Sequence, residues 1–148
     1  MKNTFSAYIS FLQRDFLTYT KDQLKEINLT YGQLPFILYI GKHPDCKQSE
    51  LIDKMHIDWG YSQRSINKLC DEDFVIKKAD DDNGHTNFLS LTSKGEEAFE
   101  LSHNVFFGWD STCFETISDE EKDILMSILN KIVIAKKDRY FDFIKSKR

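Results

Sequence analysis

Two short helical segments joined by about three residues constrain the fold of this chain more than any other feature. The first segment covers residues 47–55, and its inward face carries Leu51, Ile52 and Met55. Residues 56–58 then form a tight turn, and Asp58 is a favourable N-cap for the second helix. This arrangement predicts a helix-turn-helix.

The second helix of this pair carries an unusual polar stripe. Positions spaced i, i+3, i+4, i+7 and i+8 fall on one side of a helix. In this sequence they are Gly60, Gln63, Arg64, Asn67 and Lys68. The stripe presents amide and guanidinium donors, and no acidic residue follows until Asp71. The opposite side is small and apolar, with Ser62, Ser65, Ile66 and Leu69.

The hydrophobic period changes directly after this helix, which indicates strands. Residues 74–76 (Phe-Val-Ile) form one apolar run, and Phe88, Leu89 and Leu91 mark a second one. Between them lies Asn83-Gly84, a dipeptide that favours a tight hairpin turn. We therefore expect a β-hairpin, and a hairpin that follows a helix-turn-helix is a wing.

Helices are predicted on both sides of this central region. Apolar residues at helical spacing cover 4–24, and Thr30 with Gln33 forms a capping box for a helix that Pro44 stops. Thr92 is a plausible cap for a later helix, and Ser118 with Glu121 forms a second capping box. The predicted fold is mainly α with a small β-hairpin wing. Its expected parts are an N-terminal dimerisation helix (1–28), a winged helix-turn-helix (29–95) and C-terminal dimerisation helices (96–148).

Length and composition agree with this organisation. A chain of 148 residues is expected to form one domain, and only two prolines and six glycines favour helices over a sandwich or barrel. Three unpaired cysteines, with neither a signal peptide nor a long apolar segment, predict a cytoplasmic protein without a membrane span. The net charge of −4 gives no general attraction for nucleic acid, so any such contact needs a local patch.

The order of elements and several motifs resemble the MarR family of bacterial transcription regulators. The motifs are "LTYGQ" at 29–33, "QSELIDKM" at 48–55, Asp58 with Arg64 and Leu69 in the second helix, and "LTSKG" at 91–95. Two departures stand out. Asp73 occupies the place where the family usually has glycine, and Asn83, Gly84 and His85 replace the wing signature that carries an arginine. Asp73 is expected to adopt the left-handed conformation at some cost.

The resemblance implies a sequence-specific, homodimeric regulator of transcription, with repressor favoured over activator. Its partner would be double-stranded DNA with a near-palindromic site, and the stripe would enter the major groove. Arg64 could read guanine, Gln63 or Asn67 could read adenine, and Lys68 suits a phosphate. Tyr61 and Trp59 could pack on the sugar-phosphate backbone or wedge the helix into the domain. The predicted DNA-binding residues are Gly60, Tyr61, Gln63, Arg64, Asn67, Lys68, Lys77, Lys78 and His85.

Aromatic residues crowd into the first helix and into 104–114, where core and dimer packing explains most of them. The residues expected to be buried between two chains are Phe5, Ile9, Phe106, Ile128, Ile132 and Tyr140. In the family, small-molecule effectors often lie between the dimer helices and the winged domain. Candidates to line such an apolar pocket are Tyr8, Phe11, Tyr39, Phe107 and Trp109.

Two other function classes stay open at this level. The acidic wing, with Asp80, Asp81 and Asp82, favours a winged helix that binds protein and never touches DNA. An enzyme has no positive support, because no catalytic constellation stands out. His43 and Cys46 lie close in sequence but lack the second half of a zinc site, so neither a metal nor a cofactor is predicted. Redox chemistry at Cys46 or Cys113 competes with the ordinary role of buried cysteines as small hydrophobes.

Overall fold

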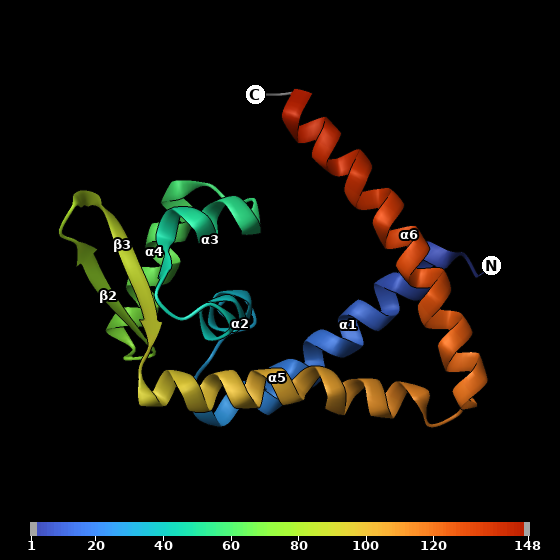
Figure 1. The fold of residues 1–148 in the computed structure, drawn as a ribbon. Helices are drawn as coiled ribbons and strands as arrows, with labels where there is room; N and C mark the ends of the chain where they lie inside the picture. Colours follow the sequence, from blue (N-terminus) through green and yellow to red (C-terminus); the bar gives the residue numbers. More distant parts are fainter. Residues whose placement is uncertain (1–2, 147–148) are drawn as a thin grey trace. The chain divides into compact units, whose positions relative to one another are not determined.

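The computed structural model describes the backbone of residues 3–146 and the side chains of residues 3–82 and 87–137 (Figure 1). Its elements, in chain order, are α1 (Phe5–Leu24), the 3₁₀ helix η1 (Lys25–Ile27), α2 (Leu34–Lys42), β1 (Cys46–Lys47), α3 (Gln48–Met55), α4 (Trp59–Asp71), β2 (Val75–Asp80), β3 (Asn83–Leu91), α5 (Ser93–Phe114) and α6 (Asp119–Ser146). The chain divides into two compact units, Met1–Trp109 and Asp110–Arg148. Among the described residues, no helix is long and apolar enough to cross a membrane.

The first unit has one hydrophobic core to which nearly all of its elements contribute. Helix α2 supplies Ile37 and Ile40, α4 supplies Ile66 and Leu69, and β3 supplies Leu89. All five side chains are fully shielded from solvent. Burial of each aliphatic side chain stabilises the fold by about 1.5–3 kcal/mol. Because α2, α4 and β3 share this core, α4 and the wing are held together by it.

The predicted helix-turn-helix is present with the expected caps. Helix α3 ends at Met55, its C-cap His56 adopts the left-handed conformation (φ 53°), and the chain then turns into α4. Asp58 caps α4, because its Oδ1 accepts a hydrogen bond of 2.8 Å from the backbone N–H of Tyr61. After α4, Asp73 adopts the left-handed conformation (φ 65°), as its position in the motif predicted.

Helix α2 begins later than its apparent capping box predicted. The Thr30 backbone N–H does donate to Gln33 Oε1 at 2.8 Å, which is one half of the box. The Thr30 hydroxyl, however, also donates to that oxygen (3.1 Å), and the Gln33 N–H bonds to the Thr30 carbonyl (3.0 Å). These bonds close a turn before the helix, which starts at Leu34. Pro35 therefore falls in the first helical turn, where its missing N–H costs no helical bond.

The wing is a three-stranded antiparallel sheet rather than a simple hairpin, with the strand order β1-β3-β2. The two-residue strand β1 pairs Cys46 with Leu89 and Lys47 with Phe88. Figure 1 shows β2 and β3 side by side next to α4. Sequence reasoning missed β1, since two residues carry no recognisable periodicity.

The turn of the wing lies two residues earlier than predicted. Asp81 and Asp82 form the turn, and Asp80 pairs with Asn83, so the Asn83-Gly84 dipeptide begins β3 instead of making the turn. The physical reason is local: the Asp80 carboxylate accepts the backbone N–H of Asp82 at 3.0 Å, a bond that aspartate commonly makes in turns. A register shift between Ala79 and Asp80 accompanies this turn.

The two long C-terminal helices start at the predicted caps. Thr92 Oγ1 accepts the backbone N–H of Gly95 at 2.9 Å at the start of α5. At the start of α6 both halves of the predicted box form, with Ser118 N–H to Glu121 Oε2 at 2.8 Å and Glu121 N–H to Ser118 Oγ at 3.2 Å. Gly95 lies against the backbone carbonyl of Phe74, so that any Cβ there would collide with the end of the wing.

Candidate nucleic-acid interface

The polar stripe of α4 faces outward. Arg64, Asn67 and Lys68 are exposed, and Gln63 is half-buried at the edge of the stripe. The opposite side of the helix is anchored, since Ser62, Ile66 and Leu69 are fully buried. The helix therefore presents its amide and guanidinium groups on a surface whose backbone is held by the core.

The N-terminal end of this surface brings Gly60 and Arg64 together. A Cβ at Gly60 would lie 3.3 Å from Arg64 Nη1 and 3.2 Å from Asp58 Oδ1, so the guanidinium rests over the glycine. Tyr61 takes the wedging role: its ring centroid is 6.0 Å from that of Phe36, although 40% of the residue remains exposed. Trp59 is 48% exposed at the same end of the helix.

Gln48 connects the recognition surface to the wing, and sequence reasoning missed it. It is completely buried, and its Nε2 donates to Gln63 Oε1 at 2.9 Å and to Ser62 Oγ at 3.5 Å. Its Oε1 accepts from Asn87 Nδ2 of β3 at 3.4 Å. The available signal was its spacing, because Gln48 shares the inward face of α3 with Leu51, and a polar residue on an apolar face needs partners.

Two further side chains of the surface are bonded to neighbours. Asn67 Oδ1 accepts a hydrogen bond of 2.8 Å from Lys77 Nζ, which links α4 to the base of β2. Lys68 Nζ lies 4.0 Å from Glu72 Oε1, one helical turn further on. Glu72 also accepts a bond of 2.7 Å from Gln33 Nε2. The Glu72 carboxylate thus contacts Lys68 and Gln33 at the C-terminal end of the helix. The residues of the stripe itself carry no carboxylate.

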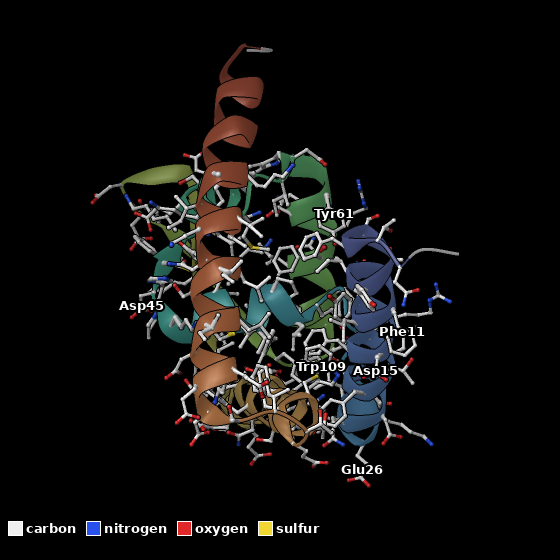
Figure 2. The ribbon with its side chains drawn as sticks, turned by 90° about the vertical axis from the view of Figure 1, so that its right-hand side faces the viewer. Phe11, Asp15, Glu26, Asp45, Tyr61 and Trp109 are labelled. Atoms are coloured by element: carbon white, nitrogen blue, oxygen red, sulfur yellow. The ribbon has the colours of Figure 1, made fainter. Side chains whose placement is uncertain are left out.

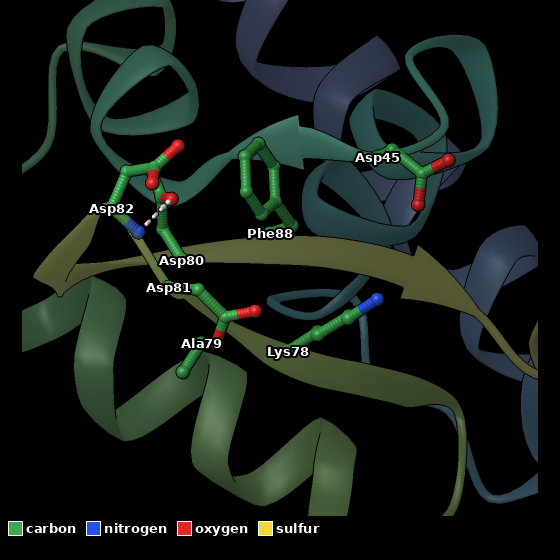
Figure 3. A pocket seen from close by; sticks show the side chains of 7 residues that line it. All are labelled: Asp45, Lys78, Ala79, Asp80, Asp81, Asp82 and Phe88. Atoms are coloured by element: carbon green, nitrogen blue, oxygen red, sulfur yellow. Dashed lines mark hydrogen bonds between the residues drawn. The ribbon is translucent and has the colours of Figure 1, made fainter.

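Lys77 and Lys78, both predicted to bind DNA, lie on opposite faces of β2. Lys77 points to α4, as its bond to Asn67 shows. Lys78 lines a cavity of about 440 Å³ together with Phe88, Asp45 and the three wing aspartates Asp80–Asp82 (Figure 3). Side chains alternate along a strand, so this separation follows from the pleat. The structure therefore joins Lys77 to the α4 surface and places Lys78 among acidic residues.

His85, the remaining predicted wing residue, lies outside the residues whose side chains the structure describes. The side chain of Asn83 falls in the same range, and the side chain of Tyr140, from the predicted dimer contact, lies outside the described residues as well. The described part of the wing tip is acidic.

The aromatic residues proposed for a ligand pocket do not share one cavity. Phe11 lines a cavity of about 230 Å³ with Arg14, Asp15 and Thr18, whereas Phe107 lines another of about 250 Å³ with Leu38, Lys42, His103 and Phe106. Tyr8 is 53% exposed on α1, and Tyr39 packs on the His43 ring at 4.6 Å. Trp109 donates its indole N–H to Asp15 at 2.9 Å (Figure 2).

Two of the three cysteines, Cys46 and Cys70, have surroundings that disfavour the reactive thiolate. Burial, reinforced by the nearby Glu50 carboxylate, raises the pKa of the Cys46 thiol to about 11, so at neutral pH it stays protonated. Burial also raises the pKa of Cys70. Among the described residues no group of three or more His, Cys, Asp or Glu side chains is placed to hold a metal ion.

No known protein-family model matches this chain, but individual regulators do. The HTH-type transcriptional regulator BilQ of Clostridium symbiosum (strain WAL-14163) is 35% identical over 132 residues, which cover 89% of this chain and 92% of the relative. BilQ of Clostridioides difficile (strain CD3) is 30% identical over 128 residues, with 86% of each chain covered. The identities extend over nearly the whole length of both relatives.

Solved structures show the same architecture. A MarR protein from Peptoclostridium difficile superposes with a TM-score of 0.82 at 25% identity, covering 96% of this chain and 93% of that one. A MarR family regulator from Listeria monocytogenes complexed with 26mer DNA gives 0.76 at 23% identity, covering 95% and 93%. The predicted fold class, mainly α with a small winged sheet, is confirmed.

Proposed function

Because this chain belongs to the MarR family of winged helix-turn-helix transcription regulators, we propose that it represses transcription by binding DNA as a homodimer. As the sequence predicted, it is a regulator and not an enzyme. The observation that carries the proposal is the α4 surface: Arg64, Gln63 and Asn67 lie on one side of a helix whose opposite side buries Ser62, Ile66 and Leu69. Such a surface fits the major groove, where guanidinium and amide groups read base edges.

Homodimer formation is supported by the exposed apolar residues of the terminal helices. On α1, Phe5, Tyr8 and Phe11 are 57%, 53% and 67% exposed. On α6, Ile124 and Ile128 are 61% and 50% exposed. Exposed apolar groups at this density mark protein contacts rather than solvated surface. Residues 1–28 and 96–148 of two chains would cover one another, while residues 29–95 of each chain would bind DNA.

A symmetric dimer dictates the form of the DNA site. Two α4 helices related by a two-fold axis would enter successive major grooves, with half-site centres about 34–36 Å apart. Occupation of such a near-palindromic site within a promoter would block transcription. The protein would act in the cytoplasm, where bacterial DNA is accessible.

Release of DNA by a small apolar or aromatic molecule is part of the proposal. The cavity between α2 and α5 is a suitable place, since it combines Phe106 and Phe107 with the cationic Lys42. Its volume of about 250 Å³ is small, so a single-ring ligand fits better than a larger one. Such a ligand would release DNA if it bound more tightly to a dimer whose half-site spacing does not match the operator.

Selection of bound duplexes from a random DNA pool with the purified protein tests this function. We expect a two-fold symmetric consensus sequence. It would identify DNA as the partner, indicate a dimer and give the distance between the half-sites. The affinity for this consensus should fall steeply with salt, because each phosphate contact releases counterions. A pool without any enriched sequence would contradict the proposal.

The acidic wing supports one other candidate, a winged helix that binds protein. Asp80, Asp81 and Asp82 would repel phosphates, and Lys78 lies among them rather than on the α4 side. In that case binding of a random or selected duplex would show a flat salt dependence. The salt slope therefore discriminates the two functions.

A further inference from the structure

The two amide side chains of the α4 surface already use their oxygen atoms in bonds within the protein. Asn67 Oδ1 accepts from Lys77 Nζ at 2.8 Å. Gln63 Oε1 accepts from Gln48 Nε2 at 2.9 Å. A side-chain amide has an acceptor oxygen with two lone pairs and an NH₂ donor group, so each bond turns the oxygen toward the protein and directs the NH₂ group away from that partner.

The orientation of Asn67 follows from the chemistry of lysine. An ammonium group has three donors and no acceptor, so only the amide oxygen can face Lys77. Lys77 itself is held in the sheet, where β2 pairs it with Leu89 of β3. Asn67 is exposed, and its NH₂ group therefore points away from the wing and toward solvent.

Gln63 is oriented by a chain of amides. The buried Gln48 accepts from Asn87 Nδ2 with its oxygen (3.4 Å), which leaves its own NH₂ group to donate to Gln63. Among the residues whose side chains are described, none bonds to the NH₂ group of Gln63. With Arg64 and Lys68 beside it, the stripe offers mainly hydrogen-bond donors to a ligand.

We propose that Lys77 and Gln48 are positioning residues that turn the amide oxygens of Asn67 and Gln63 toward the protein and so make the α4 surface prefer guanine over adenine. This inference rests on the proposed function, in which α4 enters the major groove. Guanine presents two adjacent acceptors there, N7 and O6, and both suit an NH₂ or guanidinium group. Adenine presents N7 beside an amino donor, and reading it needs an amide oxygen as well as an NH₂ group.

The proposal replaces the adenine contact that residue types alone suggest for Gln63 or Asn67. An asparagine with a free oxygen reads adenine through both ends of its amide. An asparagine oxygen that is turned toward lysine lies beside a cationic donor, and this disfavours the approach of the adenine N6 amino group, which is also a donor. Specificity at this base pair is then set by a wing residue that need not touch the base.

The test compares DNA selections with four variants of the full-length protein. Asn67→Ala identifies the base pair that Asn67 contacts, because enrichment is lost at one position of each half-site. Lys77→Met removes the donor and frees the Asn67 oxygen, whereas Lys77→Arg keeps a donor at the same place. Lys78→Met is the matched control, since it removes the same charge from the opposite face of the same strand.

We expect the wild type and Lys77→Arg to select a G·C pair at that position. Lys77→Met should shift the preference toward A·T by at least about fivefold, the lower end of the effect of a bidentate base contact. Lys78→Met should keep the G·C preference even if its overall affinity falls. A mere loss of stability would lower binding to all sequences and would leave this preference unchanged.

Two results would overturn the inference. One is an A·T preference of the wild type at the Asn67-dependent position, and the other is an unchanged preference in Lys77→Met. In either case a selected consensus would still support the proposed function. The absence of any consensus would refute both together.

Discussion

Helices α4 and α6 begin with equally well-formed caps, but their apolar residues have different surroundings. In α4, Ile66 and Leu69 are completely buried. In α6, Ile124, Ile128 and Ile134 are 61%, 50% and 52% exposed. Every fully buried apolar side chain of the described residues lies in the first unit, Met1–Trp109. A cap thus defines where a helix starts, whereas its stability comes from the surface that covers its apolar face.

Because the fully buried apolar side chains of the described residues lie in the first unit, its stability should depend on tight contacts there. The largest effect is expected for Gly95→Ala, since the added methyl group collides with the Phe74 carbonyl where the wing ends. We expect a loss of about 3 kcal/mol in the free energy of unfolding, measured by urea denaturation. Gly32→Ala is the control, because its Cβ would meet only the Tyr61 hydroxyl at 4.0 Å. Equal stability of both variants would contradict this account of Gly95.

The second unit is expected to respond through assembly rather than through the fold of a single chain. Ile128→Asp places a charge on an apolar face that a partner chain would cover. The dimer dissociation constant should rise about hundredfold, close to 3 kcal/mol, as measured by sedimentation equilibrium. Ser127→Asp adds the same charge at an exposed neighbouring position and should leave the dimer intact. Parallel behaviour of the two variants would show that the face around Ile128 stays open to solvent.

A change on the exposed side of α4 should affect binding and leave the fold unchanged. Arg64→Ala removes a side chain that is exposed and rests over Gly60, so the unfolding free energy should stay within about 0.5 kcal/mol. Affinity for the selected DNA should weaken by about 1–3 kcal/mol in a fluorescence anisotropy titration. Arg64→Lys keeps the charge without the bidentate fork and should recover only part of the loss. An affinity equal to that of the wild type would exclude Arg64 as a base contact.

The smallest effect concerns the turn that follows α4. Asp73 has a φ of 65°, a conformation that costs a residue with a side chain more than it costs glycine. Asp73→Gly should raise the unfolding free energy by about 0.5–1 kcal/mol, visible as a higher thermal midpoint. Asp71→Gly, within the last turn of the helix, should lower it by a similar amount. A decrease in both variants would mean that the Asp73 side chain stabilises the turn.

The sequence predicted the start of a helix correctly where the side-chain oxygen of the capping residue accepts a backbone N–H. Asp58 and the pair Ser118 and Glu121 start their helices as expected. Helix α2 was predicted, but its start was misplaced because both Thr30 donors bond to the single Gln33 oxygen and close a turn first. The hairpin turn was misplaced because the Asp80 carboxylate offers a competing local bond.

The composition of the α4 surface was predictable, but its bonding was not. Helical spacing placed Gln63, Arg64 and Asn67 on one face, and the structure exposes that face. The partners of the two amides come from other elements: Gln48 is 15 residues from Gln63, and Lys77 is 10 residues from Asn67. Periodicity within one helix carries no information about such contacts, since they depend on how α3 and β2 pack on α4.

The two-residue strand β1 has a mechanical consequence for how this protein could respond to a signal. Cys46 and Lys47 pair with β3 and run directly into α3, so the wing is joined to the first helix of the helix-turn-helix through the backbone. A wing tied at this point cannot swing independently of α3. A stimulus that changes the affinity for DNA is therefore expected to displace α3 and the wing together. Amide protons at the β1–β3 pairing should accordingly exchange as slowly as those of the buried helices.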